Sequence, residues 1–111
     1  MTMTLSTAVP AVVHHALDAI DASDTASLVR CFNREGFVDD WGRVYSTPRE
    51  IRRWSDAEFI GGGIELSYPT FLMVDGNSVV HAQASGKFFS GSMSLTFTVP
   101  RRLITALRIS A

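Results

Sequence analysis

Only a handful of side chains in this sequence have the chemistry for proton transfer. Two adjacent aspartates, Asp39 and Asp40, follow the apolar pair Phe37-Val38, and His81 lies in the middle of an apolar run. Carboxylates and imidazoles act as general acids and bases without a cofactor. Because side chains alternate along a strand, only one of the two aspartates can face a pocket. These residues are the candidates for an acid/base site.

The sequence offers no metal or nucleotide site. His14 and His15 are adjacent, and adjacent helical residues point about 100° apart, so the two cannot chelate one ion from the same helix face. Cys31 is the single cysteine, and no His, Asp and Glu cluster has ligand spacing. Gly61-Gly62-Gly63 lacks the lysine of a phosphate-binding loop. We expect neither a metal nor a cofactor.

Length and composition predict one compact domain over residues 1–111. Hydrophobic residues make up 46% of the chain and charged residues 19%, which leaves enough apolar surface for a core. Ten basic and eleven acidic residues give a formal charge of −1, and the arginines are scattered among acids. We therefore expect no nucleic-acid partner.

Nothing in the sequence points to a membrane or to secretion. The first residues, Met1 to Ser6, have no basic cluster, the apolar run Ala8 to Val13 contains Pro10, and no segment is long enough to span a bilayer. The lone Cys31 excludes an intramolecular disulfide. We expect a cytoplasmic protein without a membrane partner.

Three helices are predicted in the first half of the chain. An apolar stripe that recurs every three or four residues predicts a helix from about Pro10 to Ala22. Asp24 can cap a second helix from Thr25 to about Arg34. Thr47-Pro48-Arg49-Glu50 combines an N-cap threonine, a proline at the first helical position and a glutamate that completes a capping box, so it predicts a third helix from about Pro48 to Phe59.

The second half reads as four antiparallel strands, because the apolar period falls to two. Pro69 interrupts the first strand, which indicates an edge or a bulge. Turns are predicted at Asp75-Gly76-Asn77 and Ser90-Gly91-Ser92. The predicted strands are Ile64 to Val74, Val79 to Phe89, Met93 to Val99 and Leu103 to Ile109.

This order of elements resembles the nuclear transport factor 2-like superfamily, the SnoaL-like and ketosteroid-isomerase-like domains. The residues that carry the resemblance are Asp24, Phe32, Val38, Asp40, the segment Gly42 to Tyr45, the segment Pro48 to Trp54 and the segment Leu107 to Ile109. The resemblance implies an α+β cone, a curved antiparallel sheet wrapped around three N-terminal helices with an apolar pocket inside. It also implies a homodimer through the outer face of the sheet.

The same resemblance implies a role for Asp40. In ketosteroid-isomerase-like members the aspartate at the matching position is the general base that moves a proton beside a carbonyl. A carboxylate in a partly dry pocket suits this work. The alternative is that Asp40 or Asp39 caps the turn before Trp41-Gly42, or pairs with Arg43.

His81 is the second candidate, because scytalone-dehydratase-like members place strand histidines beside an aspartate. With Asp40 it would form a minimal acid/base pair for dehydration or isomerisation. The alternative follows from strand alternation, which groups His81 with Gln83, Ser85 and Lys87 on the outer face.

Five aromatic residues could line a ligand pocket or belong to the core: Trp41, Tyr45, Trp54, Phe59 and Tyr68. The donors that stabilise an enolate in the isomerases are missing, since the late strands offer only Thr96 and Thr98. Three functions stay open: a cofactor-independent isomerase or lyase that uses Asp40, a non-catalytic protein that binds a small apolar or amphipathic molecule, and a dimerisation or adaptor module.

Overall fold

The computed structural model describes residues 9–111. The predicted absence of a signal peptide concerns Met1 to Ser6, which lie outside the described residues. The helices and strands follow in the order α2 (Ala11–Asp21), α3 (Thr25–Arg30), β1 (Phe32–Asp40), β2 (Arg43–Ser46), α4 (Pro48–Ala57), β3 (Glu65–Val74), β4 (Asn77–Ser85), β5 (Ser90–Thr98) and β6 (Ile104–Ser110). No helix within this part of the chain is long and apolar enough to cross a membrane.

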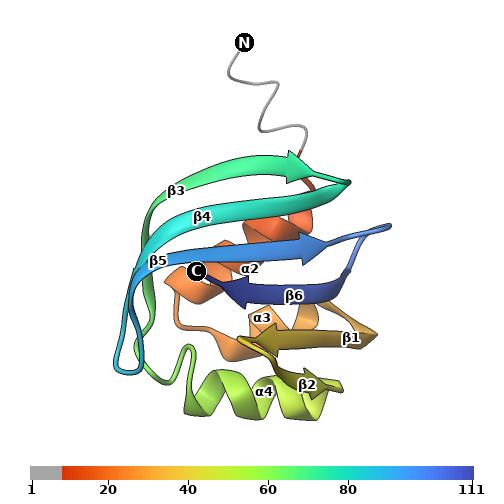
Figure 1. The fold of residues 1–111 in the computed structure, drawn as a ribbon. Coiled ribbons are helices and arrows are strands. Elements are labelled where there is room, and N and C mark those ends of the chain that lie inside the picture. The colour runs from red at the N-terminus through yellow and green to blue at the C-terminus, as the bar shows by residue number, and fades with distance from the viewer. Residues whose placement is uncertain (1–8) are drawn as a thin grey trace.

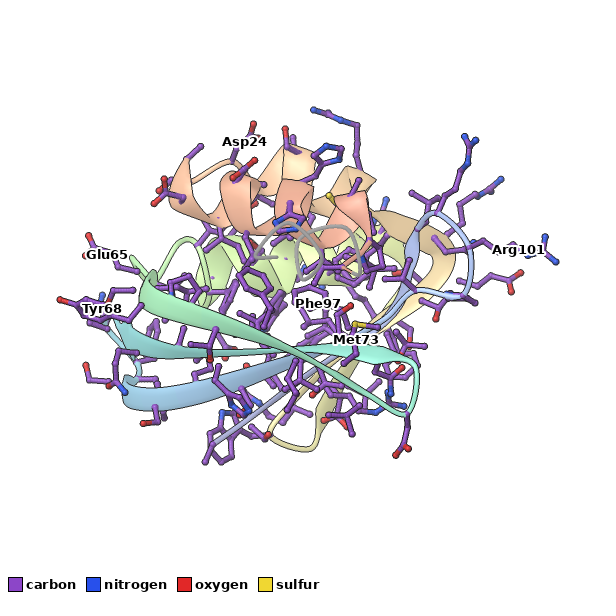
Figure 2. The ribbon with its side chains drawn as sticks, turned by 90° about the horizontal axis from the view of Figure 1, so that it is seen from above. Asp24, Glu65, Tyr68, Met73, Phe97 and Arg101 are labelled. Atoms are coloured by element: carbon purple, nitrogen blue, oxygen red, sulfur yellow. The ribbon has the colours of Figure 1, made fainter. Side chains whose placement is uncertain are left out.

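The six strands form one curved sheet in the order β2-β1-β6-β5-β4-β3 (Figure 1). Figure 2 shows the helices gathered on one face of this sheet. The predicted α+β cone is confirmed. One pair departs from the antiparallel expectation, because β1 and β6 are parallel. The chain leaves β1 through β2 and α4, builds three strands and returns with β6 beside β1 in the same direction.

Helix α2 has the predicted apolar stripe, and its buried residues include Val13, Ala16 and Ile20. Helix α3 begins at the predicted Asp24 cap, where the carboxylate accepts the Ser27 amide at 3.1 Å. The helix is shorter than predicted and ends at Arg30. Strand pairing explains the early end, since the Ile104 amide donates to the Cys31 carbonyl at 2.9 Å and draws the following residues into the sheet.

The predicted capping box of α4 is present with one change. The Thr47 hydroxyl accepts the Glu50 amide at 3.2 Å, and the Glu50 carboxylate accepts the Ser46 amide at 2.7 Å instead of the amide of Thr47. The helix ends at Ala57, two residues before the predicted boundary. These caps fix the inner face of α4, which carries the buried Trp54.

Two of the strand predictions are confirmed. β3 is an edge strand whose register shifts between Ser67 and Thr70, as Pro69 predicted. The hairpin between β3 and β4 turns at Asp75-Gly76, where both φ angles are positive, 51° and 81°.

The predicted turn at Ser90-Gly91-Ser92 is wrong, because those residues begin β5 and pair with the end of β4. β4 stops at Ser85, and residues 86–89 make the connection. The amide of Lys87 donates to the carbonyl of Gly62 at 2.8 Å, which ties this connection to the glycine segment after α4. The hairpin between β4 and β5 therefore turns earlier than the sequence pattern predicts. This earlier turn brings residues 86–89 to the wall of a pocket between the sheet and the segment after α4.

Candidate ligand-binding cavity

A cavity of about 260 Å³ lies where β1, the segment after α4 and the β4–β5 connection meet. Its walls combine apolar side chains with a few charged groups. The residues that line it are Asp40, Trp41, Arg43, Glu58, Phe59, Gly62, Ile64, Gly86, Lys87, Phe88, Phe89, Met93 and Ile109. One carboxylate, Asp40, enters this lining from the sheet.

Strand alternation brings Asp40 to the cavity. Val38, two residues earlier on β1, is fully buried and faces the helices, so Asp40 lies on the same side. The Trp54 indole donates from Nε1 to Oδ2 of Asp40 at 2.9 Å, and the carboxylate is partly buried. Asp39 points away and accepts the Gly42 amide on Oδ1 at 2.8 Å. The turn-capping role considered for either aspartate therefore belongs to Asp39.

Aromatic rings pack around this hydrogen bond. Trp54, which is 2% exposed, stacks on Phe59 with ring centroids 4.7 Å apart. Trp41 and Phe89 both line the cavity, and the centroids of their rings are 5.9 Å apart. Among the aromatic residues predicted for a pocket, Trp41 and Phe59 line this cavity. Tyr45 and Trp54 instead line a neighbouring depression between β2 and α4.

Charged side chains lie at the wall of the cavity. Arg43 and Glu58 form an ion pair. The Glu58 carboxylate, with smaller contributions from groups that include Tyr45 and Asp40, raises the pKa of Arg43. Lys87 also lines the cavity. Within residues 9–111, no group of three or more His, Cys, Asp or Glu side chains is arranged to hold a metal ion.

The structure does not bring His81 to Asp40. His81 is exposed on the outer face of β4, where its Nδ1 lies 2.8 Å from the Ser94 hydroxyl. Tyr68 is also outside the cavity, since it is 83% exposed at the β3 bulge. Both residues border a shallow depression on the outer sheet face. Alternation along β4 accounts for the position of His81, because the neighbouring Val80 and Ala82 fill the inner face.

Sequence reasoning missed two parts of the cavity lining. Lys87 was grouped with the outer face because β4 was expected to continue to Phe89, but the strand ends at Ser85 and its connection turns Lys87 to the cavity. Gly86 was the available signal, since a glycine in a strand pattern often marks a bend. Met93 and Ile109 also line the cavity, and no local signal distinguishes them from core residues.

No protein-family model and no curated protein matches this sequence. Solved structures do match its fold. A Sinorhizobium meliloti protein provisionally described as a polyketide cyclase is 25% identical, with a TM-score of 0.83, and the match covers 95% of this chain and 98% of that one. An NTF2-like protein of unknown function from Cytophaga hutchinsonii is 7% identical with a TM-score of 0.74, over 89% and 85% of the two chains.

A third structure comes from Catenulispora acidiphila, a hypothetical protein with a ketosteroid isomerase-like fold in complex with trimethylamine. It is 17% identical with a TM-score of 0.74, over 93% of this chain and 86% of that one. All three matches extend over most of both chains. The chain therefore has the NTF2-like, ketosteroid isomerase-like fold of these solved structures.

Proposed function

We propose that the cavity binds a small, mainly apolar or amphipathic molecule and that Asp40 exchanges a proton with it. One observation carries this proposal. Trp54 holds Oδ2 of Asp40 at 2.9 Å, while Oδ1 has no hydrogen-bond partner among the described residues. A carboxylate fixed through one oxygen keeps the other oxygen for a ligand.

The size of the cavity favours a compact ligand. Pockets for drug-sized molecules usually enclose roughly 300–1,000 Å³, and this one encloses about 260 Å³. Phe59, Phe89 and Met93 supply apolar walls. A one- or two-ring molecule fits this space better than a steroid does. The trimethylamine complex of the Catenulispora protein supports a small-molecule ligand in this fold.

The proposed chemistry is a cofactor-independent isomerisation or dehydration. Asp40 removes a proton from carbon beside an electron-withdrawing group, and the C–H electron pair moves into the adjacent π system. Return of the proton at a second carbon completes an isomerisation. In a dehydration the C=C bond forms as the C–O bond of a hydroxyl group on the neighbouring carbon breaks; the oxygen takes that electron pair and the proton held by Asp40 and leaves as water, which restores the Asp40 carboxylate. Arg43 and Lys87 are the cations at the cavity wall that can stabilise the negative charge that develops.

A general proton-abstraction probe tests this proposal without knowledge of the natural substrate. In 5-nitrobenzisoxazole a base removes the C–H proton, the N–O bond breaks and a coloured nitrophenolate forms. We expect saturable turnover by the wild-type protein and a loss of about 100-fold or more in Asp40→Asn. Asp39→Asn is the matched control, because it removes a neighbouring carboxylate that lies outside the cavity and keeps an oxygen to accept the Gly42 amide.

Non-catalytic binding is the second candidate. Its support is the lining itself, because no tyrosine or histidine among the described residues reaches the cavity and the Glu58 carboxylate is already paired. The unreactive analogue 5-nitroindazole separates the two functions through its quenching of tryptophan fluorescence. An enzyme keeps its affinity in Asp40→Asn and loses turnover. A binding protein shows no turnover in any variant, and only its affinity changes.

The proposal extends to a cytoplasmic homodimer that pairs through the outer face of the sheet. Leu72 is 55% exposed, and it lies beside Val79 in the register of β3 and β4. Leu72→Arg is expected to shift the protein to a monomer in sedimentation velocity, because it places a charge in that face. Leu103→Arg, at an exposed apolar position on the β5–β6 loop, is the control. Identical sedimentation of the wild type and Leu72→Arg argues against this interface.

A further inference from the structure

A second concave surface lies at the other end of the molecule from the cavity. It is an open groove of about 620 Å³ between the start of α2, the end of α3 and the β5–β6 loop. We call it the basic groove; its lining residues are Pro10, Ala11, Val12, His15, Ser27, Arg30, Cys31, Arg101, Arg102 and Leu103. Figure 2 shows Arg101 at the opposite end from Glu65, which follows the cavity residue Ile64.

Three arginines from two separate elements meet at the basic groove. Arg30 comes from the last turn of α3, and Arg101 and Arg102 come from the β5–β6 loop. No aspartate or glutamate lines the groove, and the one ion pair among the described residues is that of Arg43 with Glu58. Residues 1–8 contain no acidic side chain. The arginines therefore gather positive charge on one site of a chain whose formal charge is −1.

The arginine from the helix is already oriented. Its Nη2 donates to the Ser27 hydroxyl at 3.0 Å, and that hydroxyl donates to Asp24 at 2.6 Å. This chain of hydrogen bonds uses one guanidinium nitrogen and leaves the other donors of Arg30 for a ligand. A guanidinium held in place loses less side-chain entropy when it binds an anion.

The floor of the basic groove is apolar. Val12 and Cys31 are 8% and 7% exposed, and the side chain of Leu103 stands at the edge with 40% of the residue exposed. Burial raises the pKa of the Cys31 thiol, so this sulfur is a neutral part of the floor. Guanidinium groups at the rim and apolar side chains at the floor match a ligand that has an anionic group and a hydrocarbon part.

We propose that the basic groove binds an amphipathic anion, with its phosphate or carboxylate headgroup on Arg30, Arg101 and Arg102 and its hydrocarbon part on Val12 and Leu103. Guanidinium groups bind both headgroups through paired, charge-assisted hydrogen bonds. The site is independent of the Asp40 cavity, because the two share no lining residue.

Titration with octyl phosphate below its micelle concentration tests the proposal. Amide chemical shifts in a nitrogen-15 NMR spectrum locate the site, and we expect the shifts to concentrate at Ala11, Val12, Ser27 and Leu103. Octanoate and inorganic phosphate are the comparison probes. Stronger binding of octyl phosphate than of octanoate assigns a phosphate headgroup, and the reverse order assigns a carboxylate; inorganic phosphate should bind more weakly than octyl phosphate because it lacks the hydrocarbon part.

The main variant is Arg101→Gln combined with Arg102→Gln, since both residues are in a loop and Arg30 also stabilises the end of α3. We expect about a tenfold or greater loss of affinity. The control is Arg49→Gln combined with Arg52→Gln, which removes the same charge from α4, outside the groove. Equal losses in both double variants, shifts that map to the Asp40 cavity, or no saturable shift with any probe would overturn the proposal.

Discussion

The indole nitrogen of Trp54 donates a 2.9 Å hydrogen bond to Asp40, which ties the inner face of α4 to the last residue of β1. The two residues come from elements that are separated by β2 and a capped turn. Trp54 is buried against Phe59, so the indole is held firmly and in turn orients the carboxylate at the wall of the cavity. This hydrogen bond therefore holds α4 against β1 and also positions the carboxylate of the proposed site.

This hydrogen bond predicts an energetic coupling between the two side chains. In a double-mutant cycle of Trp54→Phe and Asp40→Ala, we expect a coupling of about 1–2 kcal/mol in the free energy of unfolding, because the acceptor is an anionic carboxylate. Urea denaturation of the four proteins measures it. Replacing the indole of Trp54 with a smaller phenyl ring also lowers stability through lost packing, but this loss is the same with and without the Asp40 carboxylate and therefore cancels in the cycle. Additive effects of the two substitutions would show that the bond adds nothing to stability.

His81 provides a prediction about the opposite face of the sheet. Because its imidazole contacts Ser94 on the outer face, His81→Ala should leave the turnover of 5-nitrobenzisoxazole within about twofold of the wild type. Sedimentation velocity should be measured on the same variant, since its position is on the proposed dimer face. A tenfold loss of turnover in His81→Ala without a change in oligomeric state would show that His81 takes part in the acid/base chemistry.

Gly61, in the glycine segment after α4, is tightly packed against the backbone at the end of that helix. A Cβ built on Gly61 would lie 1.6 Å from the carbonyl oxygen of Asp56, whereas one on Gly63 would meet no atom within 4 Å. We expect Gly61→Ala to destabilise the protein by about 3 kcal/mol or more.

The matched variant Gly63→Ala should cost only about 1–2 kcal/mol, because its φ of 73° is strained for alanine but the space around it is open. Thermal unfolding of both variants checks the order. A larger loss in Gly63→Ala would mean that backbone conformation, and not close packing, sets the requirement for glycine here.

The N-cap of α3 predicts a pH dependence of stability. Hydrogen bonds from the Ser27 hydroxyl and amide lower the pKa of Asp24 below its usual value of 3.8. The folded state therefore favours the ionised carboxylate, and this contribution is present above the unfolded pKa and is lost as the pH falls through the folded pKa. Asp24→Asn keeps a capping oxygen without the charge.

The difference in stability between the wild type and Asp24→Asn should be largest near neutral pH and should shrink below about pH 4. Urea denaturation at several pH values measures this difference. A difference that stays constant from neutral to acid pH would show that the charge of Asp24 adds nothing to the cap.

Local signals determined much of the fold. The caps at Asp24 and Thr47, the stripe of α2, the Pro69 interruption and the Asp75-Gly76 turn all depend on residues within a few positions of one another, and each is confirmed. Such features can be read from sequence because their energy comes from short-range backbone geometry and hydrogen bonding. The order of these elements was enough to predict the nuclear transport factor 2-like fold.

Only the tertiary structure decided the site. Strand alternation permitted either aspartate to face inward, and the hydrogen bond from Trp54 to Asp40 shows which one does. The early end of β4 turned Lys87 to the cavity, and pairing with Gly62 across the fold fixes that end. The parallel pairing of β1 with β6 likewise joins distant parts of the chain. These choices depend on contacts between residues far apart in sequence, which no local pattern encodes.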